Sequence, residues 1–238
     1  LIKNQKIRIF KNKQFHLYPE EVFEKLKRGD LLQVGFDGLI LKIGKKVKNY
    51  FLAECIQNGS LEKNKGVHLS NRNIKLNFIT KKDFEAIKVG KKFKIKNYAL
   101  SFTNTVNDII NFSKLLKQER KIYKIETYQA LKNFKVLRNK AEEFLIDRGD
   151  LSKEITIEKI PYTQRFLFKN AKKKNKIYIA TNLLESMIEK PYPTRAEAND
   201  IYNSIEMGAA GLVLAAETAV GKYPEECIKF LKKIISQF

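Results

Sequence analysis

Residues 121–151 read KIYKIETYQALKNFKVLRNKAEEFLIDRGDL, and they place two short apolar runs on either side of a helical stretch. The runs are KIYKIE at 121–126 and EEFLID at 142–147. Similar runs, NYALSF, KIYIA and GLVLA, stand before and after them with helical stretches between. Strands that alternate with helices predict parallel β/α units with right-handed crossovers, which build either an open doubly wound sheet or a barrel.

Three of the helical stretches carry either a helix-start signal or an apolar stripe at helical spacing. Residues 105–117 place their apolar side chains on one stripe, which is the helical period. Thr194 and Glu197 form a capping-box pattern, and Gly208 is a stop signal for the helix that follows. Pro224 suits the first turn of the last helix. We therefore expect helices after 105, 194 and 224.

The first 75 residues differ from the rest because they are rich in strand-like runs. These runs are QFHLY, DLLQVGF, LILKIG and NYFLAECI. The pair Asp37-Gly38 lies between two of them and is a strong hairpin signal. A separate β-rich module is expected here.

The composition limits the classes of partner. The net charge is +21, but only eight of the 47 basic residues are Arg, and the Lys residues are spread along the chain. No nucleic-acid motif is present, so nucleic acid is not the expected partner, whereas anionic phosphoesters suit such a surface. No apolar run approaches the ~18 residues of a membrane span, and Cys55 and Cys227 have no C-x-x-C spacing. We expect a cytoplasmic protein without a membrane partner.

Polar residues follow several of the strand candidates. Lys124 and Glu126 are two residues apart on one strand and point the same way. The next strand runs into Gly149 and Asp150, and KIYIA is followed by Thr181. Ligands of parallel sheets bind at these strand ends. Two carboxylates with a Lys suit Mg²⁺ and phosphoryl transfer better than zinc, although each pair alone is also typical of a solvated strand end or a turn.

The run ATNLLESMIEKPYPTRAEANDI at 180–201 closely resembles the signature of the pyruvate kinase family. YKIE at 123–126 is similar to the catalytic-lysine motif of that family, and RGDL at 148–151 to its metal-binding loop. GAAGLVLAAETAVGKYP at 208–224 resembles its last barrel strand. Order and spacing agree, and further similar runs upstream extend the resemblance over nearly the whole chain.

The resemblance implies an α/β fold, a partial (β/α)8 TIM barrel with a small inserted β-rich lid. Residues 1–9 would be a barrel segment, 10–72 the lid, and 73–238 the later barrel strands. Only five of the eight strands are readable, and the regulatory domain at the family's C-terminus is absent from this sequence. We therefore expect a homo-oligomer, or a further chain segment, to complete the barrel.

The resemblance also implies roles for single residues in Mg²⁺- or Mn²⁺-dependent phosphoryl transfer from phosphoenolpyruvate to ADP. Lys124 would neutralise the transferring phosphoryl group, and Glu126 and Asp150 would hold the metal ion. Gly149 and Asp150 would contact the substrate, and Thr181 would bind it and help deliver a proton to the enolate.

Two further residues, Arg8 and Lys65, would meet the nucleotide phosphates.

Some positions depart from the family pattern. Leu1 and Ile2 stand where the family places a monovalent-cation pair, Asp-Thr, which argues against K⁺ dependence. Asp147 replaces a small residue before the RGD loop. Two alternatives to an active pyruvate kinase therefore stay open: a truncated or degenerate homologue that binds or regulates without turnover, and a basic nucleic-acid-binding protein.

Overall fold

The computed structural model of the chain describes residues 1–35, 38–72 and 74–238. It separates into two compact units, Leu1–Ala86 and Ile87–Phe238. The division at residues 9 and 72 stays a prediction. The boundary between the two compact units falls within helix α2, Lys81–Lys92.

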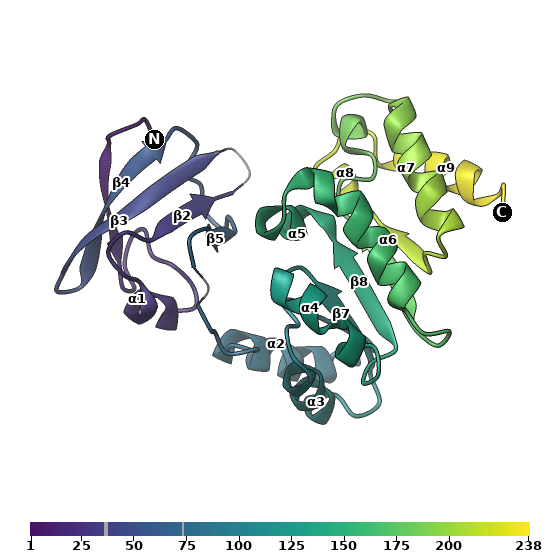
Figure 1. Ribbon diagram of the computed structural model, residues 1–238, viewed down its shortest axis with the longest axis horizontal. Coiled ribbons are helices and arrows are strands. Elements are labelled where there is room, and N and C mark those ends of the chain that lie inside the picture. The colour runs from purple at the N-terminus through teal and green to yellow at the C-terminus, as the bar shows by residue number, and fades with distance from the viewer. Residues whose placement is uncertain (36–37, 73) are drawn as a thin grey trace. The chain divides into compact units, whose positions relative to one another are not determined.

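The first unit is built on an antiparallel sheet with strand order β1-β4-β3-β2-β5. Its strands are β1 Lys6–Phe10, β2 Leu31–Val34, β3 Leu39–Val47, β4 Tyr50–Gln57 and β5 Val67–Leu69. Apolar side chains alternate along β3 and β4, so each strand turns one face to a core around Phe23 of the short helix α1, Glu21–Lys25. The expected β-rich module is present (Figure 1).

Two expectations from the sequence concern this unit: a hairpin at Asp37-Gly38 and a strand at QFHLY. The β2–β3 pair is antiparallel with Val34 opposite Leu39, as a hairpin requires, but Asp37 of the expected turn lies outside the described residues. The prediction of a strand at QFHLY is wrong, because those residues form only an isolated bridge between His16 and Phe10. Gln14 has a φ of 46°, which interrupts an extended chain at that point.

The second unit is built on a parallel sheet with strand order β10-β9-β8-β7-β6. Its strands are β6 Asn97–Leu100, β7 Arg120–Ile125, β8 Glu143–Asp147, β9 Lys176–Ala180 and β10 Gly211–Val213. All four neighbouring pairs are parallel and follow chain order, as successive right-handed β/α units produce. All five predicted strands of this part are confirmed.

Helices join the parallel strands, and Figure 1 shows α4 and α6 lying over one face of β7 and β8. The helices are α3 Val106–Leu115, α4 Tyr128–Leu137, α5 Arg148–Glu154, α6 Ile160–Asn170, α7 Arg195–Glu206, α8 Ala216–Ala219 and α9 Pro224–Ile235. Short 3₁₀ turns occupy Ile157–Lys159 and Glu185–Ile188. The expected helices after 105, 194 and 224 are therefore present, and Thr194 forms the predicted capping box.

The two faces of the parallel sheet differ in chemistry. Tyr123, Ile125, Phe144 and Ile146 alternate along β7 and β8 and are buried, with Phe134 of α4 packed edge-on against Phe144 at 5.3 Å between ring centroids. Burial of such side chains stabilises the fold by about 2 kcal/mol each. The residues between them point to the opposite face, and these include Lys124 and Asp147, so that face carries charge instead of a continuous apolar layer.

Among the described residues, β6 and β10 each pair on one side only. No helix in the described part of the chain has both the length and the apolar character that a membrane span needs.

Candidate active site

The candidate site lies where β7, β8 and β9 end. The sheet is parallel and in register, with Lys124 opposite Leu145 and Asp147 opposite Ala180. The carboxyl ends of the three strands therefore meet at one edge, which is where parallel sheets bind ligands. Thr181 follows β9 directly at that edge.

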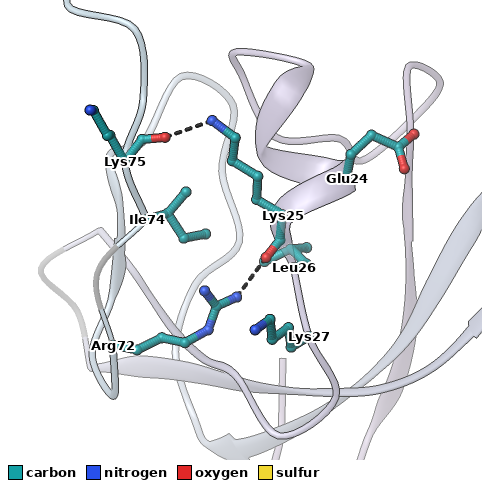
Figure 2. A pocket seen from close by; sticks show the side chains of 7 residues that line it. All are labelled: Glu24, Lys25, Leu26, Lys27, Arg72, Ile74 and Lys75. Carbon is teal, nitrogen blue, oxygen red and sulfur yellow. Dashed lines mark hydrogen bonds between the residues drawn. The ribbon is translucent and has the colours of Figure 1, made fainter.

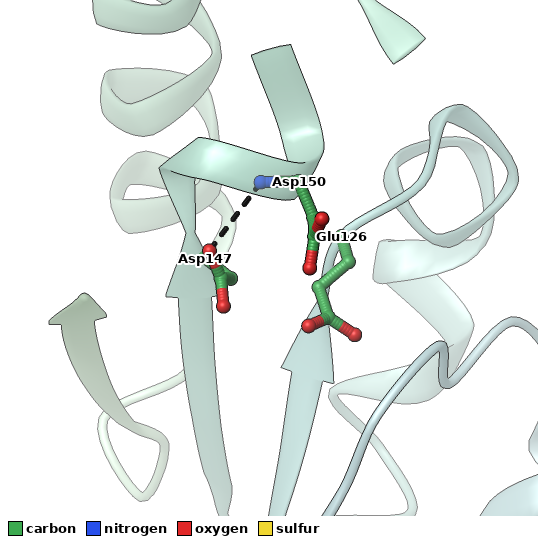
Figure 3. Close-up of side chains that lie close together, drawn as sticks. All are labelled: Glu126, Asp147 and Asp150. Carbon is green, nitrogen blue, oxygen red and sulfur yellow. Dashed lines mark hydrogen bonds between the residues drawn. The ribbon is translucent and has the colours of Figure 1, made fainter. Parts of the chain in front are cut away.

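Three carboxylates gather at this edge. Glu126 follows β7, Asp147 ends β8, and Asp150 stands in the first turn of α5. One oxygen from each lies within 4.8 Å of the others, and Figure 3 shows the Asp150 carboxylate directed toward Glu126. The arrangement follows from the turn at 148–150, because Asp147 caps α5 and accepts a hydrogen bond from the Asp150 N–H at 3.4 Å.

The ammonium group of Lys124 joins two of these carboxylates. Its Nζ lies 2.6 Å from Glu126 Oε1 and 2.9 Å from Asp147 Oδ2. Burial alone would lower the pKa of Lys124, but the attraction of Glu126 and Asp147 outweighs it and raises the pKa above its ordinary value. Lys124 is thus a fixed positive charge at the strand ends.

Glu126 is the most deeply buried group of the site, with 1% of its surface exposed. One carboxylate oxygen accepts the backbone N–H of Phe102 at 2.5 Å. The other, Oε1, is buried and accepts no hydrogen bond of acceptable geometry from the described residues, although Lys124 is close. Burial raises the pKa of this carboxyl, and Lys124 opposes that rise only in part.

Thr181 holds an unusual backbone conformation at the end of β9. Its φ of 67° lies in the left-handed region, which is strained for a β-branched residue. Its Oγ1 accepts the Gly149 N–H at 2.8 Å, and its single proton can go to Ala180 O at 2.6 Å or Asp147 Oδ1 at 3.2 Å. The hydroxyl is therefore fixed against the 148–150 turn.

Arg148 holds the strained peptide of Thr181 in place. Its guanidinium donates to the carbonyl oxygen of Thr181 from Nε at 3.1 Å and from Nη2 at 2.8 Å, and to Asn182 O at 2.9 Å. Nη1 pairs with Asp200 of α7 at 2.5 Å. With only 8% of its surface exposed, Arg148 is part of the interior that supports the site.

The structure brings together five residues that strand-end reasoning selected: Lys124, Glu126, Gly149, Asp150 and Thr181. Their roles stay predictions.

Sequence reasoning did not select Asp147 or Arg148 as site residues. Asp147 ends a strand, so the strand-end rule that selected Glu126 could have found it. Arg148 carries no such signal, because its contacts reach more than 30 residues along the chain.

The two residues expected to meet nucleotide phosphates belong to the first unit. Arg8 is exposed on β1, and its guanidinium carbon lies 5.2 Å from the centre of the Tyr50 ring. Lys65 is also exposed, and its ammonium pairs with Glu62 at 2.9 Å. Their expected role stays a prediction.

The first unit also has a hollow of ≈ 470 Å³ (Figure 2). The residues around it are Glu24, Lys25, Leu26, Lys27, Arg72, Ile74 and Lys75. Two of its cations already serve the fold: Arg72 donates to Asp30 and to Lys25 O, and the Lys25 ammonium donates to Lys75 O. The strand-end cluster is therefore the better candidate site.

Comparison with known proteins agrees with this geometry. The family model "Pyruvate kinase, barrel domain" matches residues 2–228. This chain belongs to the pyruvate kinase family, and its fold is a partial (β/α)8 barrel with a small β-rich lid.

Curated relatives point the same way. A pyruvate kinase of Thermotoga maritima is 35% identical over 217 residues, which cover 89% of this chain and 47% of the relative. Pyruvate kinases of Chlamydia muridarum and Methanocaldococcus jannaschii are each 32% identical, covering 93% and 89% of this chain. The chain spans about half the length of the curated relatives it matches.

Proposed function

We propose that this chain carries the phosphotransfer site of a pyruvate kinase, which moves a phosphoryl group from phosphoenolpyruvate to ADP and yields pyruvate and ATP in glycolysis. The observation that carries the proposal is the position of Lys124 Nζ, 2.6 and 2.9 Å from two carboxylates at the ends of β7 and β8. Family membership supplies the reaction class.

Lys124 would act as a preorganised positive charge beside the transferring phosphoryl group. Phosphoryl transfer spreads negative charge over the equatorial oxygens, and an ammonium group beside those oxygens stabilises that charge. Two carboxylates hold the ammonium at the strand ends before substrate arrives. Loss of one such donor costs about 10²–10³ in rate in other enzymes.

The carboxylates fit a hard divalent ion. Three oxygen donors within 4.8 Å of one another, and a buried Glu126 Oε1 that accepts no hydrogen bond from the described residues, suit Mg²⁺ or Mn²⁺. Glu126 and Asp150 would hold the ion, which when bound neutralises phosphate charge.

Thr181 and Gly149 would position the substrate. The Thr181 hydroxyl is fixed by Gly149 and would help deliver a proton to the enolate. When substrate binds, the Gly149 N–H would donate to the substrate carboxylate in place of the Thr181 hydroxyl. Asp150 would contact the substrate from the same turn. Arg8 and Lys65 would meet the phosphates of the nucleotide. K⁺ dependence is not expected.

The remaining expectations on assembly and location also belong to the proposal. Unpaired strand edges are disfavoured, and among the described residues β6 and β10 pair on one side only. Further strands, from a longer chain or from a second copy, would complete the barrel. A cytoplasmic location fits glycolysis.

One observation favours a second candidate, a homologue that binds but does not turn over. Lys124 is engaged by two carboxylates, so its charge is partly neutralised unless one of them is drawn away.

A coupled assay for pyruvate separates the two candidates. Phosphoenolpyruvate, ADP and Mg²⁺ are supplied with and without K⁺, and the chain is compared with Lys124→Met and with Lys173→Met, a control in an exposed turn. We expect pyruvate from the unaltered chain and Lys173→Met, and a loss of about a thousandfold or more in Lys124→Met. A folded chain that forms no pyruvate would support the second candidate.

A further inference from the structure

We propose that Asp147 is a third carboxylate ligand of the divalent ion, and that ion binding frees Lys124 from Asp147. The inference rests on the proposed function, because it extends the cation site formed there by Glu126 and Asp150. It assigns a new role to a residue that so far only caps α5 and pairs with Lys124.

Distances place Asp147 within reach of such an ion. One oxygen each of Glu126, Asp147 and Asp150 lies within 4.8 Å of the other two. Mg²⁺ binds oxygen at about 2.0–2.1 Å, so two ligand oxygens on opposite sides of the ion are about 4 Å apart. A small rotation of the partly exposed Asp150 side chain is enough to close that difference.

The three carboxylates differ in burial and in the hydrogen bonds and ion pairs that hold them. Glu126 is buried, and one of its oxygens is fixed by the Phe102 N–H while Oε1 has no hydrogen bond from the described residues. Asp147 is fixed at the end of β8, with Oδ1 near the Thr181 hydroxyl and Oδ2 directed to Lys124. Asp150 is about one-third exposed and can move toward the other two.

The charges also favour a divalent cation. Three carboxylates face two ammonium groups, since Lys124 pairs with Glu126 and Asp147 and Lys153 pairs with Asp150 at 3.1 Å. The Lys124 ammonium therefore lies between Glu126 and Asp147, where a cation would bind. A divalent ion between the carboxylates would repel it and satisfy both oxygens.

Displacement of Lys124 would link the ion to the substrate. An ammonium held by two carboxylates is a poor partner for phosphate, because its charge is already compensated. Once the ion takes Asp147, the Lys124 ammonium is free to turn toward an incoming phosphoryl group. Binding of the divalent ion would thus precede strong binding of a phosphorylated ligand.

The test is direct binding of Mn²⁺ to the 238-residue chain, measured by electron paramagnetic resonance of the free ion. The variants are Asp147→Ala, the isosteric Asp147→Asn, Asp150→Asn, and Glu225→Gln as a control for loss of one exposed negative charge. We expect Asp147→Ala and Asp147→Asn to weaken Mn²⁺ binding about tenfold or more. Glu225→Gln should leave it unchanged.

A second measurement distinguishes direct ligation by Asp147 from the electrostatic effect of a nearby negative charge on Mn²⁺ binding. Water-proton relaxation of bound Mn²⁺ counts the waters on the ion, and removal of a ligand oxygen in Asp147→Ala should add one. A weaker affinity with an unchanged water count would overturn ligation by Asp147. Circular dichroism confirms folding, and Asp147→Asn retains the volume of the side chain if Asp147→Ala does not fold.

The outcomes distinguish this inference from the proposed function. If both Asp147 variants bind Mn²⁺ within twofold of the unaltered chain while Asp150→Asn binds weakly, the inference is wrong and the cation site stands. If Asp147 ligates Mn²⁺ as expected but no pyruvate forms, the inference stands and the proposed function is wrong. An unaltered chain that binds no Mn²⁺ overturns the inference.

Discussion

The hydroxyl of Thr181 accepts a hydrogen bond from the backbone N–H of Gly149 at 2.8 Å. This bond joins the end of β9 to the first turn of α5, two segments more than 30 residues apart in the sequence. Arg148 holds the carbonyl of the same threonine, so side chain and backbone are both fixed. Both residues are proposed to contact substrate. Because the hydrogen bond joins them, a shift in one moves the other.

Replacement of Thr181 tests the value of that bond. In Thr181→Ala the Gly149 N–H loses its acceptor, which costs about 1 kcal/mol, while loss of the β-branch relieves strain at the φ of 67°. We expect thermal unfolding to change little and pyruvate formation to fall about a hundredfold. Thr181→Ser keeps the hydroxyl and should recover most of the rate. Equal rates for the alanine and serine variants would contradict the assigned role.

Gly149→Ala probes the same contact from the other side. A Cβ at Gly149 would lie 3.3 Å from Thr181 Oγ1 and 3.5 Å from Asp147 Oδ1. The first distance is tight, so the hydroxyl must move by a few tenths of an ångström. We expect a loss of about tenfold in turnover, because small misplacements of reacting groups are costly, with a melting temperature within a few degrees. Steady-state kinetics and calorimetry measure the two effects, and an unaltered turnover would show that Thr181 has room to move.

The parallel half of the fold could be predicted because its strands are short apolar runs separated by helical stretches, some of which carry start signals. Ile122, Tyr123 and Ile125 belong to one such run, and Thr194 marks a helix start that the structure confirms. QFHLY has similar apolar content but no regular partner strand, and Gln14 interrupts it with a positive φ. Local patterns do not contain that information, since pairing is decided by tertiary contacts.

The site shows the same division between local and distant information. Lys124 and Glu126 could be selected because they share one strand and one face. Asp147 belongs to the site because it pairs with Lys124 on the neighbouring strand, and Arg148 because it donates a hydrogen bond to the carbonyl of Thr181. Such contacts depend on the register of β7, β8 and β9, which spacing in the sequence does not specify.

The capping box of α7 offers a prediction about stability. Thr194 Oγ1 accepts a hydrogen bond from the Glu197 N–H at 3.2 Å, and the Glu197 carboxylate accepts one from the Thr194 N–H at 2.7 Å. Thr194→Ala should lower the free energy of unfolding by about 1 kcal/mol, whereas Thr194→Ser should lie within about 0.5 kcal/mol of the unaltered chain. Urea unfolding followed by circular dichroism gives both values. Equal losses in the two variants would mean that the hydroxyl does not cap the helix.

The Asp30–Arg72 pair of the first unit predicts a pH-dependent stability. Asp30 is 2% exposed and accepts Arg72 Nε at 2.7 Å, Arg72 Nη2 at 2.6 Å and the Lys27 N–H at 2.7 Å. Burial tends to raise the pKa of this carboxyl, but the hydrogen bonds from Arg72 and Lys27 outweigh it and hold the pKa below its ordinary value. Asp30→Asn should therefore destabilise the chain by about 2 kcal/mol at neutral pH, less than for a fully buried pair because Arg72 is partly exposed.

The sign of the pH effect follows from the lowered pKa. A carboxyl whose pKa is lower in the folded chain contributes its stability above the unfolded value of about 4 and loses it as the pH falls through the folded value. The gap in unfolding free energy between the unaltered chain and Asp30→Asn should thus be constant from pH 7 to about pH 5 and should shrink below about pH 4. Urea unfolding of both chains across this range measures the gap. A gap that stays the same at pH 3 would show that Asp30 stabilises the fold through its shape and hydrogen bonds alone, without its charge.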